Sequence, residues 1–207
     1  MKRRAPTSVR PERRPVLSAG PRKRAVVEGR AGDEGRSSSR SRIPPQELVR
    51  RAARVKLVLL DVDGVLTDGR IWYGPDGEAL KAFDVRDGHG IVLLRDHVDF
   101  GVISGRPGRA TQKRLEELRF KHMIFAQRDK LEGYASLGAL GVADDEVAYM
   151  GDDVNDVPLL KKVGLSACPA DAMPEAKAAV HFVTTAKGGR GAVRELCDLI
   201  RKARGIG

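Results

Sequence analysis

The sequence is poor in cysteine and in aromatic residues. It has two cysteines among 207 residues, and aromatic side chains make up 4%. Cys168 and Cys197 stand apart without a CxxC spacing, which argues against a disulfide framework or a zinc site and favours a reducing compartment. No apolar run approaches the roughly 20 residues that a membrane span needs, and the Arg-rich N-terminus lacks the apolar core of a secretory signal. We therefore expect a cytoplasmic protein without membrane segments.

Acidic residues are scarce in the first quarter of the chain only. Residues 1–56 contain 17 Lys and Arg against 5 Asp and Glu, whereas the rest contains 21 against 23. Residues 1–54 are rich in Arg, Pro, Ser and Gly, so we predict a disordered arm with a short helix near Pro45–Ala53. We expect this arm to be a dispensable extension. Nucleic-acid binding is the less favoured alternative, because aromatic side chains that would stack on bases are missing.

From residue 55 the pattern becomes that of a folded domain, 55–207. Short apolar runs typical of buried strands alternate with amphipathic stretches typical of helices. The predicted strands are Lys56–Leu60, Phe100–Ile103, Met123–Ala126, Val147–Met150, Leu165–Cys168 and Val180–Val183. This alternation predicts an α/β fold with a doubly wound, mostly parallel sheet.

One segment interrupts the alternation. Arg70–Val85 predicts a β-hairpin that turns at Pro75-Asp76-Gly77, with strands near Ile71–Tyr73 and Ala79–Phe83. The insertion is too short to form a lid, so we expect a fold without a cap domain.

Polar residues follow several of the predicted strands. Asp61 and Asp63 follow the first strand, Ser104-Gly105-Arg106 the second, and Gly151–Asp156 (GDDVND) the fourth, while Lys130 opens the helix before that fourth strand. Because parallel sheets bind ligands beyond the carboxyl ends of their strands, these groups are expected to meet at one edge. A P-loop is excluded because Gly105–Gly108 lacks the following GK[ST].

Clustered carboxylates repel one another unless a cation joins them, and a site with few, oxygen-only ligands favours Mg²⁺. Asp61 would be a nucleophile that takes a phosphoryl group, and Asp63 would protonate the leaving alkoxide and then activate water. Ser104 and Lys130 would hold the phosphoryl oxygens. Taken singly, each of these residues has an ordinary structural explanation, so the hypothesis depends on their joint order.

That order resembles the haloacid-dehalogenase superfamily. Asp61–Asp68 (DVDGVLTD) is similar to its first motif, Ser104 to the second, Lys130 to the third, and Gly151–Asp156 to the fourth. The resemblance implies a Rossmann-like fold and an Mg²⁺ ion bound by Asp61, the main-chain carbonyl of Asp63, and Asp152. It also implies that Asp153 and Asp156 stand near the metal.

Within that superfamily, longer stretches resemble the 3-deoxy-D-manno-octulosonate 8-phosphate phosphatases, which act in lipopolysaccharide synthesis. These stretches are Gly74–Glu78, Lys81–Gly90, Tyr149–Asp153, Val163–Leu165 and Gly188–Glu195. The resemblance implies a phosphorylated sugar acid as substrate and a homotetramer in which a neighbouring subunit covers the site. The substrate-binding residues it implies are Asp63, Asp84, Val85, Arg86, Asp87, Gly88, Arg106, Arg114, Lys130 and Arg190.

Two other functions compete with this prediction. One is a related phosphatase for nonulosonate 9-phosphates. The other is a non-catalytic regulatory domain of the same fold, against which the intact set of Asp61, Asp63, Lys130 and Asp152 argues.

Overall fold

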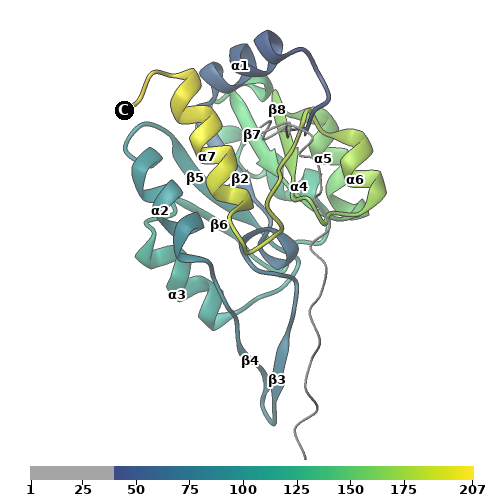
Figure 1. Ribbon diagram of the computed structural model, residues 1–207. Helices are drawn as coiled ribbons and strands as arrows, with labels where there is room; N and C mark the ends of the chain where they lie inside the picture. Colours follow the sequence, from purple (N-terminus) through teal and green to yellow (C-terminus); the bar gives the residue numbers. More distant parts are fainter. Residues whose placement is uncertain (1–39) are drawn as a thin grey trace, which may run out of the picture. The chain divides into compact units, whose positions relative to one another are not determined.

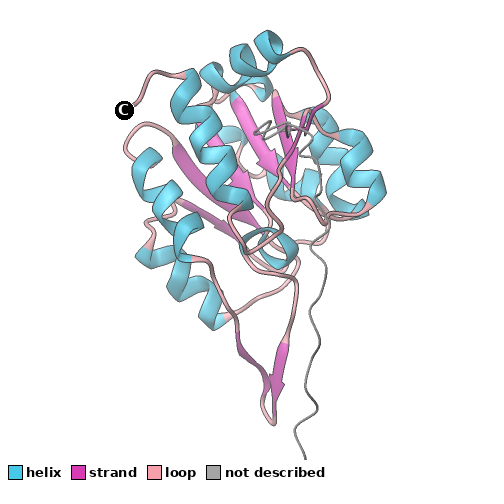
Figure 2. Ribbon diagram, viewed as in Figure 1, coloured by secondary structure: helices cyan, strands magenta, loops and turns pink. Residues whose placement is uncertain are grey.

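The computed structural model describes residues 40–207. They form an α/β domain around a seven-stranded sheet with the strand order β1-β9-β8-β7-β2-β5-β6 (Figures 1 and 2). All neighbouring strands are parallel except β1, which pairs antiparallel with β9. The strands are β1 (Arg40–Ser41), β2 (Leu57–Leu60), β5 (Asp99–Ile103), β6 (His122–Ile124), β7 (Val147–Met150), β8 (Leu165–Cys168) and β9 (Phe182–Val183). The predicted parallel α/β sheet is thereby confirmed.

Helices cover both faces of the sheet. The helices are α1 (Pro45–Arg54), α2 (Val85–Leu94), α3 (Arg109–Glu117), α4 (Lys130–Ala135), α5 (Val157–Lys162), α6 (Pro174–Ala179) and α7 (Ala192–Ala203). Short turns complete the chain: η1 (Val62–Leu66), η2 (Gly138–Leu140), η3 (Asp144–Glu146) and η4 (Val154–Asp156). None of the described helices is long and apolar enough to cross a membrane.

Alternate residues of the strands pack into two hydrophobic cores, one on each face of the sheet, because successive side chains of a strand point to opposite faces. Val58 and Leu60 of β2 pack with side chains of α1, α2, α3 and α7. Leu57 and Leu59 pack on the other face with side chains of α5 and α6. Because β2 is buried on both faces, its sequence is continuously apolar rather than alternating. This central strand ends where the chemistry was predicted to begin.

The chain enters the domain earlier than the sequence suggested. The prediction placed the start at residue 55, but α1 packs against α7 and contributes the buried Leu48 and Ala52 to the core. The helix near Pro45–Ala53 is confirmed as α1. The prediction of a disordered, dispensable arm and its less favoured alternative, nucleic-acid binding, fall largely on residues 1–39, which lie outside the described residues.

The predicted hairpin is confirmed as strands β3 (Trp72–Gly74) and β4 (Gly77–Leu80). It forms a small sheet of its own that projects away from the main sheet (Figure 1). Gly77 at the turn has a φ of +107°, a conformation that residues with a Cβ rarely adopt. In the described part of the chain this hairpin is the insertion, and no cap domain accompanies it.

Candidate active site

The carboxyl ends of β2, β5 and β7 bring the predicted residues together. These strands are neighbours in register, with Leu60 paired to Val102 on one side and Met150 on the other. Asp61 continues from β2, and its backbone N–H donates to the carbonyl of Met150 at 2.9 Å. The sheet order reverses direction beside β2, which is the position where open α/β sheets form their ligand crevice.

Asp61 is paired with Lys130. The Lys130 Nζ atom lies 2.7 Å from Asp61 Oδ1 and 2.6 Å from the carbonyl oxygen of Ile103. Asp129 fixes the start of α4 by accepting hydrogen bonds from two backbone N–H groups of its first turn, and so aims Lys130 at the strand ends. A buried ammonium group requires such partners. This pair fits a nucleophile whose negative charge is balanced in place.

Three carboxylates meet at this point. Asp61, Asp152 and Asp156 each offer an oxygen within 4.8 Å of the others. Both oxygens of Asp156 are occupied, because Oδ1 accepts from the Tyr149 hydroxyl at 2.5 Å and Oδ2 accepts from the backbone N–H of Asp152 at 3.0 Å. By contrast, Asp152 Oδ1 is buried and has no hydrogen-bond partner. An orphaned carboxylate oxygen beside two further carboxylates is a site for a cation.

The protonation equilibria reflect this crowding. Burial, strengthened by the charges of Asp61 and Asp156, raises the pKa of Asp152 to about 8. Burial also raises the pKa of Asp61 to about 6, although Lys130 opposes the shift. The donor set is entirely oxygen, and its carboxylates repel one another until a hard cation joins them. The residues present therefore fit Mg²⁺, with Asp61 and Asp152 as the carboxylates that would hold it.

Glycines make room for this cluster. Gly64 has a φ of +92°, and a Cβ at this position would stand 2.0 Å from Asp152 Oδ2. Gly188 lies against the same loop, since its Cβ would stand 1.8 Å from the carbonyl oxygen of Gly64. The neighbouring Gly189 donates its N–H to Val65 at 2.9 Å. The Gly188–Gly191 loop thus forms one wall of the site.

Asp63 belongs to a second ion-pair group. Its Oδ1 is paired with Lys81, a residue that follows β4 of the hairpin, and Arg106 Nε lies 4.0 Å from its Oδ2. The sequence prediction included Asp63 and Arg106 but not Lys81. No local pattern distinguishes this lysine from a solvated one.

Ser104 ends β5 and is buried. Its hydroxyl oxygen accepts from the backbone N–H of Arg106 at 3.2 Å, which shapes the turn after the strand. The Arg106 side chain itself is half exposed and points toward Asp63. Their predicted roles as phosphoryl-binding and substrate-binding residues stay predictions.

The predicted substrate segment Asp84–Gly88 forms the start of α2. Asp84 caps the helix by accepting from Arg86 N–H at 2.7 Å and pairs with the Arg86 guanidinium, also at 2.7 Å. Arg86 donates to the carbonyl of Arg190 at 3.0 Å, and Arg190 lies 3.5 Å from Asp68. Arg190 therefore stands beside the first motif of its own chain, linked through Arg86 to α2. Val85, which lies between Asp84 and Arg86 in the sequence, is exposed.

Asp87 and Gly88 are buried in the first turn of α2. Asp87 is buried, and its two oxygens accept from the backbone N–H groups of Gly191 and Arg194 at the start of α7. Gly88 lies against Arg114, because a Cβ there would stand 2.3 Å from the guanidinium. The contacts predicted between these three residues and the substrate stay predictions, and Asp87 has a structural role as the anchor of α7.

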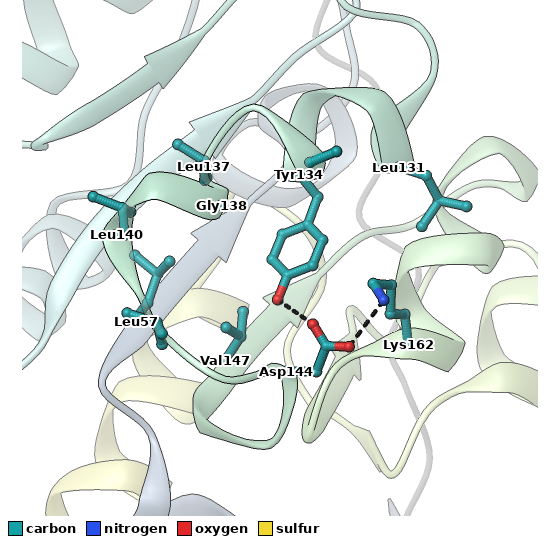
Figure 3. Close-up of a pocket in the computed structure, with 11 residues that line it drawn as sticks. Leu57, Leu131, Tyr134, Leu137, Gly138, Leu140, Asp144, Val147 and Lys162 are labelled. Atoms are coloured by element: carbon teal, nitrogen blue, oxygen red, sulfur yellow. Dashed lines mark hydrogen bonds and ion pairs between the residues drawn. The ribbon is translucent and has the colours of Figure 1, made fainter.

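An apolar cavity of about 490 Å³ lies at the opposite end of the sheet (Figure 3). Leu57 and Val147, which line it, begin β2 and β7, whereas the carboxylate cluster follows the last residues of the same strands. The polar side chains that line the cavity contact one another. Asp144 accepts hydrogen bonds from Tyr134 at 2.7 Å and from Lys162 at 2.9 Å. These groups satisfy one another, so the cavity carries none of the chemistry assembled around Asp61.

Comparison with known proteins agrees with this geometry. Residues 123–196 match the model of the haloacid dehalogenase-like hydrolase family. The 3-deoxy-D-manno-octulosonate 8-phosphate phosphatase of Yersinia pestis is 46% identical over 160 residues, which cover 76% of this chain and 86% of that protein. The corresponding enzyme of Escherichia coli K12 is 44% identical over 161 residues, covering 77% of this chain and 86% of the relative.

A solved structure extends the likeness to three dimensions. The 3-deoxy-D-manno-octulosonate 8-phosphate phosphatase from Moraxella catarrhalis, determined with magnesium, phosphate and the sugar acid, superposes with a TM-score of 0.75. It is 35% identical, and the match covers 78% of this chain and 94% of that one.

Proposed function

Because the chain belongs to the 3-deoxy-D-manno-octulosonate 8-phosphate phosphatases within the haloacid dehalogenase-like hydrolases, we propose that it cleaves this ester to the free sugar acid and phosphate. The observation that carries the proposal is the buried Asp61, paired with Lys130 and set beside the unpartnered carboxylate oxygen of Asp152. A nucleophile, a balancing cation and a metal position thus meet at the end of one strand.

The residues divide the reaction into two steps. Asp61 attacks phosphorus while the bond to the sugar oxygen breaks, and Asp63 gives its proton to that oxygen. A water molecule then attacks the phosphorus of the aspartyl phosphate and gives its proton to Asp63. The bond between phosphorus and Asp61 breaks, so that phosphate is released and Asp61 is regenerated. Lys130 and Ser104 hold the phosphoryl oxygens throughout. A bound Mg²⁺ supplies positive charge that offsets the charge developing on the transferring phosphoryl group.

Recognition of the sugar acid would fall to the cationic residues around the opening. Arginine suits a carboxylate because its planar fork donates two parallel hydrogen bonds. Arg106 and Arg190 stand within ion-pair distance of Asp63 and Asp68 in the first motif, which supports their assignment. The assignments of Asp84–Gly88 and Arg114 rest on the family resemblance.

The test is phosphate release from 3-deoxy-D-manno-octulosonate 8-phosphate, measured with Mg²⁺ and with EDTA beside a nonulosonate 9-phosphate and common sugar phosphates. We expect fast, EDTA-sensitive release from the octulosonate ester alone. Higher kcat/KM for the nonulosonate ester would move the substrate to that related class. No release from any ester would favour the non-catalytic domain.

We also propose a homotetramer in the cytoplasm, assembled through the hairpin. Trp72 and Tyr73 of β3 are 59% and 70% exposed, and Leu80 of β4 is exposed as well. Large apolar side chains gathered on a projecting hairpin are typical of a protein interface. A neighbouring subunit at this position would also shield the aspartyl phosphate from stray water, because residues 40–207 include no cap domain that could do so.

Replacing Trp72 and Tyr73 together by serine is expected to shift the protein from tetramer to monomer or dimer, because the hairpin would lose its apolar contact area. The measurement is mass by analytical ultracentrifugation at micromolar concentration. Val49→Ser, which removes an exposed apolar residue of α1, is the matched control and should leave the mass unchanged. A double variant that stays tetrameric would place the interface elsewhere.

A further inference from the structure

Lys81 is a lysine whose whole side chain is inside the protein. Its side chain is 1% exposed, although it follows the exposed strand β4 of a projecting hairpin. Lysine is almost never fully buried unless it is paired. Its partner is therefore the key to its presence at this position.

The ammonium group of Lys81 stands between two carboxylates. It forms an ion pair with Asp63 Oδ1, and Glu78 Oε1 lies 3.6 Å away. Glu78 in turn lies against the loop after β5, because a Cβ on Gly108 would stand 3.2 Å from its Oε1. Lys81 thus joins the hairpin, the first motif and the loop that carries Arg106.

This pair repeats the arrangement at the nucleophile. Lys130 holds Asp61 by Oδ1, and Lys81 holds Asp63 by Oδ1, so each of the two carboxylates has its own buried lysine. The hydroxyl of Thr67 also approaches Asp63 Oδ1, at 3.5 Å. Arg106 Nε lies 4.0 Å from the other oxygen, Oδ2, which is too far for a hydrogen bond. One oxygen of Asp63 is held, and the other is left for the reaction.

We propose that Lys81 is a positioning residue for Asp63. It fixes the carboxyl group through Oδ1 so that Oδ2 faces the substrate and gives its proton to the bridging oxygen as the bond from that oxygen to phosphorus breaks. Lys81 acts through Asp63 and does not contact the transferring phosphoryl group. The inference rests on the proposed function, since it assigns Asp63 the role of acid in that reaction. It also means that the hairpin contributes to catalysis within its own subunit.

The leaving group gives a direct test. A sugar alkoxide leaves only with a proton, whereas p-nitrophenolate leaves without one. Lys81→Met is expected to slow the first turnover of the sugar-acid phosphate about 10²-fold, the scale of general acid catalysis, and that of p-nitrophenyl phosphate less than about 5-fold. Rapid mixing at saturating Mg²⁺ is used to measure release of the leaving group in a single turnover. This measurement isolates the first step from the later attack of water. The KM for both esters should stay within about 3-fold.

Two controls separate positioning from folding. Lys121→Met removes a lysine that pairs with Asp99 at the far end of β5 and should change neither rate. Lys81→Arg keeps a positive charge that can reach Asp63 and should retain most of the rate that Lys81→Met loses.

The outcomes separate the two hypotheses. Equal slowing of both esters, or a raised KM for both, would show that Lys81 binds phosphate and would overturn the inference, as would unchanged rates. If the wild type hydrolyses other sugar phosphates but not the octulosonate ester, the proposed substrate fails and the same comparison is made with the sugar phosphate it accepts. A wild type inactive on every ester would overturn both.

Discussion

Asp61→Asn is expected to lower kcat by about 10⁴-fold or more, because an amide cannot form the phosphoryl-enzyme bond on which both steps depend. Phosphate release under saturating Mg²⁺ and substrate measures the loss. Asp99→Asn is the matched control, since Asp99 begins β5 at the opposite end of the sheet, and it should keep the wild-type rate. Activity within 100-fold of wild type would exclude Asp61 as the nucleophile.

The same variant should remain folded. Burial raises the pKa of Asp61 to about 6, so its carboxylate is held at a cost that the neutral amide does not carry. Lys130 keeps the carbonyl of Ile103 and the nearby Asp156 as partners. We therefore expect a melting temperature no lower than that of the wild type without metal, checked by calorimetry. In the wild type, borohydride reduction of the aspartyl phosphate during turnover should convert Asp61 alone into homoserine. A different modified residue would contradict the assignment of Asp61 as nucleophile.

The strands could be predicted because they obey simple physics. The central strands β2, β7 and β8 are buried on both faces of a parallel sheet. Each is therefore a short, continuous run of buried residues, such as Val147–Met150 between polar turns. Once the strands are known, the edge at which Asp61 and Asp152 meet follows from the direction of a parallel sheet. This is why four short motifs far apart in sequence gave one site.

Helix α1 shows what composition conceals. Five of its ten residues are Gln, Glu or Arg, its first residue is Pro45, and its sequence continues the basic composition of the preceding residues. Only Leu48 and Ala52, four residues apart on one face, are buried against the domain. Two apolar residues are too weak a period to separate a docked helix from an unstructured arm.

Lys81 and Asp87 show a different limit. Asp87 lies in the segment Asp84–Gly88, for which the family resemblance implied substrate binding, whereas Lys81 only opens the longer stretch that resembles the family. In the structure Lys81 pairs with Asp63, and Asp87 anchors the backbone of α7. These partners are 18 and 107 residues away along the chain. Local sequence cannot indicate which distant partner a charged side chain meets. The types of group at the site were therefore predictable, and their pairing was not.

Magnesium binding is expected to depend steeply on pH through Asp152. Its pKa is raised to about 8, first by burial and then by the charges of Asp61, Asp156 and Asp153. Below that pH Asp152 carries a proton that the metal must displace, so affinity falls as pH falls. Lowering the pH from 8.5 to 6.5 should raise the apparent Kd for Mg²⁺ about 25-fold, with a plateau above about pH 9. Titration calorimetry in two buffers of different ionisation enthalpy measures the affinity and the protons released.

Asp152→Asn distinguishes this linkage from a general effect of pH. The amide cannot be ionised, so the variant should bind Mg²⁺ more weakly at every pH and should release no proton between pH 6.5 and 8.5. Asp61, whose pKa is about 6, is ionised across most of this range and adds little to the slope. Asp99→Asn should keep the wild-type slope. A wild-type affinity that is flat with pH would mean that Asp152 is ionised without the metal, so that the surrounding protein already offsets the repulsion among the three carboxylates.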